Sequence, residues 1–322
     1  MDKRELIRRL LDDIEPYVTH LPGPVGRSTE VPRLTVWAST TPTPPVPAVF
    51  EPMFYVILRG SKVLVMGANR FELSGGSCAT SSFGVPYTHQ LVSAAPGVPY
   101  VGISLHLDIP KLTRMMLDMP PREHRWTCAV KAGELEGAVG EAFGRLVGLL
   151  NSPADVGMLA PFYESELYYR LLQSSMGDTL RQVGQRNDRV QQIKFAADWL
   201  GANSEKSITI SDLAAKAGMS STSFYRHFRA VTGYSPLAFQ RRMRLLEARK
   251  MLSAGAANVS SIAYDVGYQS ASQFSREYKN VFGTSPVADL RKGQHVFNKG
   301  EVEKIEPSRI RPMDDNHPTD AV

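Results

Sequence analysis

The sequence predicts an α+β protein with two domains: an N-terminal β-barrel or β-sandwich with flanking helices, and an all-helical C-terminal domain. Two observations predict this division. Short apolar segments recur at roughly ten-residue spacing between residues 53 and 108, which is typical of a sandwich or barrel. Between residues 190 and 292 the apolar positions recur at helical spacing instead, and glycines separate the segments. The length of 322 residues also favours two cores over one.

The net charge of +5 is distributed unevenly along the chain. Residues 186 to 292 hold 16 Lys and Arg against 8 Asp and Glu, whereas the rest of the chain holds 21 against 24. A basic segment joined to a mildly acidic one indicates a nucleic-acid-binding module attached to a second domain. A solvated basic face would give the same count, so charge alone does not decide between them.

Composition also indicates the cellular compartment in which the protein works. Two cysteines, Cys78 and Cys128, exclude a disulfide framework and suit a reducing cytoplasm. The longest apolar runs are far shorter than the roughly 20 residues that a membrane-spanning helix needs. The charged, amphipathic N-terminus lacks the apolar core of a signal peptide. We therefore expect a cytoplasmic protein without a membrane partner.

The N-terminal domain, residues 1–180, is predicted to begin with a helix over residues 2–15. A proline-rich segment, Thr40–Pro52, must then be extended. Six strands are expected after it, at residues 53–58, 62–66, 70–73, 78–82, 89–94 and 100–108. Two helices, over residues 135–150 and 160–176, follow and would present an apolar face to the barrel or to a second copy of the chain.

A cupin-like barrel enzyme would need two or three histidines and a carboxylate around one metal ion. The histidines of this half, His20, His89, His106 and His124, are widely separated and show no metal-ligand spacing. We therefore predict no metal, no cofactor and no catalytic residue. An enzyme in the barrel, fused to a DNA-binding domain, is the alternative class, and the missing ligands argue against it.

Several residues of this half are candidates for effector binding. Arg59, Lys62 and Arg70 share one predicted hairpin and could bind a carboxylate or a phosphate, although such cations are often a solvated edge. Cys128 lies close in sequence to Arg122, His124 and Arg125, which could lower its pKa. Cys78 is more typical of a small apolar strand residue, but either cysteine could sense a redox or electrophile signal.

The basic half contains repeated helix signals. Thr209 and Asp212 predict the start of a helix over residues 210–217, and Ser220 caps a helix from about Ser221 to Val231. A long helix begins at Pro236, and Asn258 caps a short helix that ends at Gly267. The final helix, which ends near Gly283, has Phe274 and Tyr278 on its apolar face.

These signals form an internal duplication. The same or similar residues recur at a separation of 50, namely Phe224 and Phe274, Arg226 and Arg276, Phe228 and Tyr278, Gly233 and Gly283, and Pro236 and Pro286. Each copy is a glycine turn followed by a helix with an apolar back and a polar front, which is typical of a helix-turn-helix. The sequence therefore predicts two helix-turn-helix units.

The segments AGMSSTSFYRHFRAVTGYSP (217–236) and VGYQSASQFSREYKNVFGTSP (266–286) resemble the two helix-turn-helix units of the AraC/XylS family of bacterial transcription regulators. The first half is similar, less strongly, to the regulatory domain of that family, through Glu51-Pro52, Arg59-Gly60, Lys62, Pro86, Pro96 and Pro99-Tyr100. The resemblance implies a ligand-sensing and dimerisation domain over residues 1–180, a linker over 181–189 and a DNA-binding domain over 190–292. The polar composition of residues 293–322 predicts a disordered tail.

The resemblance also implies roles for individual residues. Base contacts are expected from Thr222, Tyr225 and Arg226 in the first unit and from Ser272, Gln273 and Arg276 in the second. Arg226 and Arg276 suit guanine, and Gln273 suits adenine. Phosphate contacts are expected from Ser220, Arg229, Ser270 and Lys279. The two arginines could instead be phosphate anchors or intramolecular partners, and Tyr225 is bulky for a base-reading position.

The resulting expectation is a sequence-specific transcription regulator of the bacterial cytoplasm, which joins the nucleoid when it binds DNA. Its expected partners are double-stranded promoter DNA, RNA polymerase and a second copy of the chain. A small-molecule effector in the N-terminal domain is expected to shift the dimer geometry or the interdomain contact. That effector could be an anionic or nucleotide messenger, or the signal could be covalent at a cysteine.

Overall fold

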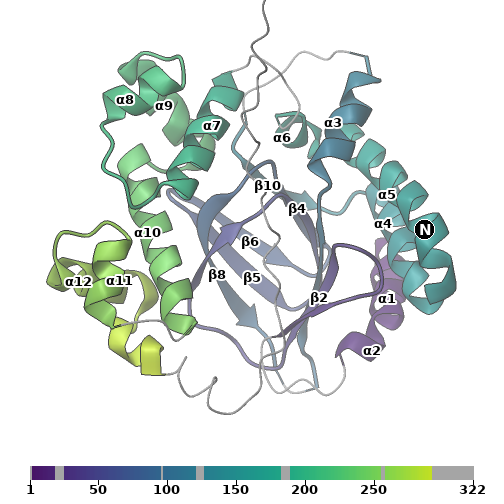
Figure 1. Ribbon diagram of the computed structural model, residues 1–322. Coiled ribbons are helices and arrows are strands. Elements are labelled where there is room, and N and C mark those ends of the chain that lie inside the picture. The colour runs from purple at the N-terminus through teal and green to yellow at the C-terminus, as the bar shows by residue number, and fades with distance from the viewer. Residues whose placement is uncertain are drawn as a thin grey trace, which may run out of the picture.

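The computed structural model describes residues 2–18, 25–95, 97–120, 127–182, 189–254 and 258–291 (Figure 1). The predicted tail, residues 293–322, and most of the predicted linker, residues 183–188, lie outside these described residues. Among the described helices, none combines the length and apolarity needed to cross a lipid bilayer.

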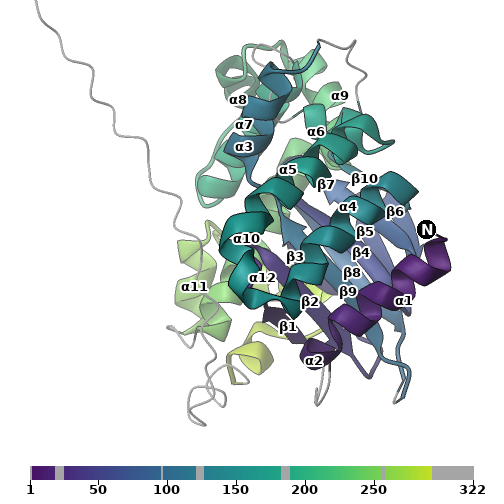
Figure 2. The ribbon, with the colours of Figure 1, turned by 90° about the vertical axis from the view of Figure 1, so that its right-hand side faces the viewer.

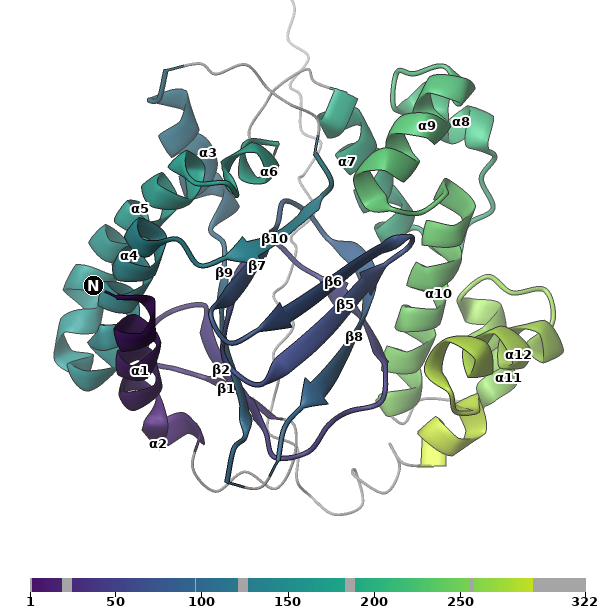
Figure 3. The same cartoon turned by 180° about the vertical axis from the view of Figure 1, so that it is seen from behind.

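The described strands of the N-terminal half form two antiparallel sheets that face each other (Figure 3). The six-stranded sheet has the order β1 (Val25–Ser28), β2 (Leu34–Ser39), β9 (Tyr100–His106), β4 (Met53–Arg59), β7 (Ser77–Ser81), β10 (Val130–Glu134). The four-stranded sheet has the order β3 (Val46–Phe50), β8 (Val85–Ser93), β5 (Ser61–Met66), β6 (Asn69–Ser74). The predicted sandwich or barrel is therefore confirmed as an open, sandwich-like pair of sheets.

Strand β4 is a continuous apolar run from Met53 to Leu58 because both faces of its sheet are buried. Its residues Phe54 and Val56 pack on the side of the N-terminal helices, whereas Tyr55 and Ile57 point between the two sheets. Side chains alternate between the faces of a strand, so a strand buried on both sides needs a continuous apolar run. This explains why residues 53–58 lack the apolar and polar alternation that is visible in β5.

Helices cover the outer face of the six-stranded sheet (Figure 2). They are α1 (Lys3–Asp13), α4 (Gly137–Gly148) and α5 (Val156–Gln173), with the shorter α2 (Glu15–Val18), α3 (Ile109–Leu117) and α6 (Gly177–Arg181) at the margins, and two 3-10 turns at Leu149–Asn151 and Pro153–Asp155. Leu10, Phe143 and Leu167 are fully buried in the resulting core.

The C-terminal half is helical, as predicted. Its elements are α7 (Arg189–Ala202), α8 (Ile210–Lys216), α9 (Ser221–Thr232), α10 (Pro236–Ser253), α11 (Val259–Asp265) and α12 (Ala271–Phe282). Helix α10 runs between the α8–α9 pair and the α11–α12 pair (Figure 1). The first pair shares a continuous apolar core with the space between the sheets, whereas the second pair packs around Leu252, Phe274 and Tyr278 in a core of its own.

Candidate DNA interface and effector site

The two helix-turn-helix units repeat each other in detail. Ser220 and Ser270 cap the N-termini of helices α9 and α12, and their hydroxyl oxygens accept hydrogen bonds from backbone N–H groups three residues later. Both helices end at a glycine in the left-handed conformation, Gly233 with φ 78° and Gly283 with φ 70°. A left-handed residue after the last turn is the usual place for glycine, because it has no Cβ.

The predicted base-reading residues lie on the free faces of these helices. Thr222, Tyr225 and Arg226 are exposed on α9, and Ser272, Gln273 and Arg276 are exposed on α12. Of the predicted phosphate contacts, Arg229 and Lys279 are exposed as well. Ser220 and Ser270 serve as helix caps, so their backbone N–H groups and helix N-termini are the parts that can face phosphate. Each unit therefore presents donors and a guanidinium group to solvent.

The predicted base-reading residues of the two units differ in their contacts. Arg226 lies beside His227, with 3.5 Å between Arg226 Nη2 and His227 Nε2. Burial, and then the guanidinium groups of Arg226 and Arg189, lower the pKa of His227. In the second unit, Gln273 Nε2 donates to Glu277 Oε1 at 3.1 Å. Arg276 makes no hydrogen bond or ion pair with any described residue, and its guanidinium is available to a partner.

Helix α10 fixes the two units to each other through Arg244 and Gln240. The Arg244 guanidinium donates to the carbonyl oxygens of Ser204, Glu205 and Lys206 in the loop before α8, and to that of Gly267 in the second turn. Gln240 Nε2 donates to the Ser204 and Lys206 carbonyls at 3.2 and 2.7 Å. One arginine thus joins the first unit, the central helix and the second unit.

The β5–β6 hairpin of the N-terminal domain touches the first unit (Figure 3). Ala68 in its turn and Asn69 at the start of β6 line a cavity of about 480 Å³ together with Tyr225, Arg226 and Arg229 of α9. Nearby, the N–H of Ala129 donates to the carbonyl of Val231 at 2.8 Å. The hairpin thus stands at the predicted DNA-reading face of α9.

Lys62 lies on the same hairpin and points between the sheets. It is only 7% exposed, its Nζ lies 4.5 Å from the centre of the Tyr55 ring, and no carboxylate pairs with it among the described residues. Burial lowers the pKa of Lys62 to about 7. An amine without a counter-charge in an apolar interior is costly, and this is the usual environment of a functional lysine.

Aromatic and imidazole groups surround Lys62. The hydroxyl groups of Tyr55 and Tyr100 form a hydrogen bond of 2.8 Å, and the rings of Tyr87 and His89 stack at 5.5 Å. Burial, and then the Lys62 charge, lower the pKa of His89 to about 3, and its Nδ1 has no hydrogen-bond partner within the part of the chain that the structure describes. None of these four residues was predicted from sequence as an effector contact. The inward alternation of Tyr87, His89 and Leu91 along β8 was the available signal.

The other effector candidates lie elsewhere. Arg70 is exposed and pairs with Glu72 at 3.0 Å, and Arg59 is half-buried at the end of β4. The structure does not bring the three cations of the hairpin together. Burial raises the pKa of the Cys78 thiol to about 12 and also raises that of Cys128, so both favour the unreactive thiol form. Within the described residues, no group of three metal-ligating side chains occurs.

Comparison with protein families gives two matches. Residues 30–179 match the model of the AraC-type transcriptional regulator N-terminus, and residues 213–292 match a helix-turn-helix domain. The chain is also 28% identical over 120 residues to the transcriptional activator RhaS of Mannheimia succiniciproducens, which covers 37% of this chain and 44% of RhaS. An AraC-like regulator of Streptomyces lividans is 39% identical over 87 residues, 27% of this chain and 28% of the relative. The chain thus matches about half or less of these relatives' lengths.

A solved structure of ToxT from Vibrio cholerae has the same overall fold. It superposes with a TM-score of 0.53 at 12% identity, and the match covers 80% of this chain and 97% of ToxT. A second ToxT structure, with a TM-score of 0.51, holds an unsaturated fatty acid, and a third holds (E)-4-(8-methylnaphthalen-1-yl)but-3-enoic acid.

Proposed function

The chain belongs to the AraC family of transcriptional regulators, and from this we propose that it controls transcription by binding promoter DNA through helices α9 and α12. The observation that carries this proposal is the duplicated reading face. Two capped helices present Arg226 and Arg276 at equivalent, exposed positions, and α10 fixes their relative placement. Two such helices on one side of B-DNA would occupy successive major grooves about 34 Å apart.

The test is a footprint on the DNA upstream of the chain's own gene. We expect one chain to protect two short segments whose centres lie about one helical turn apart, or roughly 10 base pairs. A double Arg226→Ala, Arg276→Ala variant should lose both segments. Protection of a single groove, or binding that is equal on unrelated DNA, would refute the bipartite reader.

We further propose that the effector is an organic anion held between the two sheets by Lys62. An anionic group would supply the counter-charge that the buried amine lacks, and tyrosine hydroxyls beside it could donate hydrogen bonds. The carboxylic acids bound by ToxT, which shares the fold, support this class of ligand. The raised thiol pKa values of Cys78 and Cys128 favour this model over a cysteine sensor.

The β5–β6 hairpin would transmit the effector signal. Lys62 lies on β5, and the turn at the end of the same strand contacts α9 beside Tyr225 and Arg226. A ligand that moves β5 would therefore shift the turn against the reading helix. We propose that the effector regulates DNA binding by changing the fraction of molecules in which the hairpin contacts α9. This requires that the effector bind with different affinity when the contact is formed and when it is broken.

Helix α5 supplies a surface for the proposed homodimer. Met158, Phe162 and Tyr169 are 72%, 65% and 45% exposed, and their spacing places them on one outward face of α5. A stripe of large apolar side chains that lie next to one another and are exposed, as these three are, is typical of an interaction surface. A second copy of α5 would bury this stripe.

A further inference from the structure

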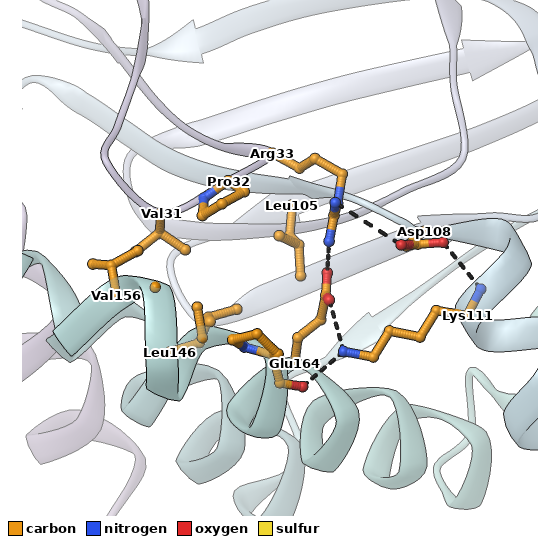
Figure 4. Close-up of a pocket in the computed structure, with 12 residues that line it drawn as sticks. Val31, Pro32, Arg33, Leu105, Asp108, Lys111, Leu146, Val156 and Glu164 are labelled. Atoms are coloured by element: carbon orange, nitrogen blue, oxygen red, sulfur yellow. Dashed lines mark hydrogen bonds and ion pairs between the residues drawn. The ribbon is translucent and has the colours of Figure 1, made fainter.

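A second cavity lies behind the six-stranded sheet (Figure 4). Its wall residues Leu105 and Leu146 belong to the core under the helices, whereas Lys62 lies over Tyr55 in the core between the sheets. It has a volume of about 350 Å³ and lies between the β1–β2 turn and helix α5. Seven of its wall residues have apolar side chains, namely Val31, Pro32, Leu105, Leu146, Val156, Ala160 and Pro161. The volume is at the small end of the range for ligand pockets, about 300–1,000 Å³.

Charged side chains close one end of the cavity (Figure 4). Glu164 is 6% exposed, and its carboxylate accepts hydrogen bonds from Arg33, from Lys111 Nζ at 2.9 Å and from the Tyr168 hydroxyl at 2.9 Å. Asp108 Oδ1 accepts from the backbone N–H of Lys111 at 3.0 Å, and its Oδ2 lies 4.0 Å from Arg33 Nη1. The two cations and two anions balance, so the site has no net charge.

Arg33 adopts an unusual backbone conformation beside the cavity. Residues 31–34 form a turn, in which the N–H of Leu34 donates to the carbonyl of Val31 at 3.2 Å and Pro32 occupies the second position. Arg33, the third residue, has φ 64° and is the single non-glycine residue with positive φ in the described chain. That position of such a turn favours glycine. Unusual backbone held in place by its surroundings is often found at ligand sites.

At the charged end of the cavity, most of the groups that remain free to form hydrogen bonds are N–H donors. A guanidinium has five N–H groups and an ammonium has three. Arg33 uses its Nη2 on Glu164, and Lys111 Nζ uses two protons, on Glu164 and on the Pro161 carbonyl at 2.7 Å. A carbonyl oxygen of a ligand could accept from the remaining groups without changing the charge balance.

We propose that this cavity is a second small-molecule site, which binds an uncharged, largely apolar compound that carries a carbonyl oxygen. The apolar body would lie against Leu105, Leu146 and Val156, and the carbonyl oxygen would face Arg33 and Lys111. A carboxylate is disfavoured, because it would add a net negative charge next to the buried Glu164. The bound compound would join the 31–34 turn to helix α5.

The experiment uses full-length protein and a matched pair of probes, acetylcyclohexane and cyclohexanecarboxylate, whose binding is measured by ligand-observed NMR titration. The ketone should bind the wild-type protein more tightly than the carboxylate does at this site. Ala160→Leu fills the cavity and should abolish ketone binding. Arg33→Gly suits the turn conformation but removes the donor, and should weaken ketone binding about tenfold, the value of one hydrogen bond to a charged group.

Lys62→Met is the control for the other site. It should leave ketone binding unchanged, because Lys62 lies on the far side of the sheet. The proposal is overturned if the ketone does not bind, or if its affinity is the same in Ala160→Leu as in the wild type. Loss of ketone binding in Lys62→Met with retention in Ala160→Leu would also overturn it, and would place the ketone between the sheets. None of these results depends on DNA binding or on an anionic effector.

Discussion

Gly67 in the β5–β6 turn faces the backbone of Gly233 at the end of α9, and a Cβ atom on Gly67 would lie 1.9 Å from the Gly233 carbonyl oxygen. The contact is also tight in reverse, because a Cβ on Gly233 would lie 2.6 Å from the Met66 carbonyl oxygen. Both glycines have positive φ. The two domains can approach this closely because neither residue has a side chain.

Gly67→Ala should open this contact. The added methyl cannot fit against backbone atoms, so the hairpin must move away from α9 and expose the predicted DNA-reading face beside Tyr225 and Arg226. If the contact restrains DNA binding, affinity for the operator without effector should rise at least fivefold, at the lower end of typical allosteric couplings of about 1–3 kcal/mol. Fluorescence anisotropy with labelled DNA measures this change.

Gly97→Ala is the matched control, because Gly97 has φ 80° but its added Cβ would meet no atom of a non-adjacent described residue within 4 Å. It also places a side chain at a residue with positive φ, and so strains the backbone in the same way, but it does not touch α9. Equal effects of the two substitutions on DNA affinity would show that backbone strain alone, and not the interdomain contact, is responsible. A folded Gly67→Ala protein with wild-type affinity would contradict the restraining role of the hairpin.

Arg244→Met should loosen the joint between the two helix-turn-helix units. The substitution leaves the carbonyl groups of Glu205 and Gly267 without this donor, and we expect the free energy of unfolding to fall by about 2–3 kcal/mol. Affinity for DNA with both half-sites should fall more than affinity for a single half-site, because the spacing is no longer fixed. Urea unfolding and anisotropy on the two DNAs measure these quantities.

Lys250→Met is the comparison for Arg244, since Lys250 lies on the same helix and forms only an exposed pair with Glu247 at 3.8 Å. It should change the unfolding free energy by less than about 1 kcal/mol. Arg244→Lys should not restore the wild type, because an ammonium lacks the planar fork that reaches several carbonyls. Full activity of Arg244→Lys would argue that charge alone is required.

The helical domain could be predicted from sequence almost completely because its signals are local. Thr209, Ser220 and Asn258 cap the helices that they were expected to cap, and Gly233 and Gly283 end theirs. Each signal involves contacts within about four residues along the chain. Because the helix-turn-helix occurs twice, the helix limits predicted in one unit were supported by the same signals in the other. The strands from residue 53 to residue 108 were also predicted, since their apolar runs are bounded by turns.

The remaining features depend on contacts between distant residues. Strand β3 lies within the proline-rich segment, and it tolerates Pro47 because it is at the edge of its sheet. The contact between Arg33 and Glu164 joins residues 131 positions apart, and no local pattern predicts it. Lys62 was selected as one of three cations on a hairpin, but only the fold reveals that it points inward and Arg70 outward.

Lys62 should make stability depend on pH. Burial lowers the pKa of the folded state to about 7, below the ordinary value of 10.5, so between these values the unfolded chain binds the proton and the folded chain does not. Stability should therefore rise with pH in this window, by about 1.4 kcal/mol per pH unit at most. The difference between wild type and Lys62→Met in urea unfolding, measured at pH 7 and pH 8.5, isolates this contribution.

His89 does not complicate this window, because its pKa of about 3 keeps the imidazole neutral above pH 7. A saturating organic anion beside Lys62 should raise the lysine pKa again and flatten the pH dependence. A wild-type curve parallel to that of Lys62→Met would indicate that Lys62 is solvated or paired. In that case the proposed anion site would lose its main support.

Arg276→Ala and Lys279→Ala should separate base reading from phosphate binding. Both residues are exposed on α12, but Arg276 lies at a predicted base-reading position and Lys279 at a predicted backbone position. Arg276→Ala should cost about 1–3 kcal/mol on the operator and relax the preference at one base pair. Lys279→Ala should weaken specific and non-specific binding equally and reduce the salt slope by about one. Equal loss on operator and random DNA in Arg276→Ala would make Arg276 a phosphate anchor.

Phe162→Arg should separate the proposed dimer. Phe162 lies at the centre of the stripe that Met158 and Tyr169 extend, and in a symmetric dimer each substitution acts twice. Loss of about 1.5–3 kcal/mol of apolar burial per copy, with charge repulsion added, should raise the dimer dissociation constant at least 100-fold. Phe195→Arg introduces the same charge at a 49% exposed phenylalanine on α7 and should leave the dimer intact. Sedimentation equilibrium measures both constants, and a Phe162→Arg protein that remains dimeric would show that the chains associate through another face.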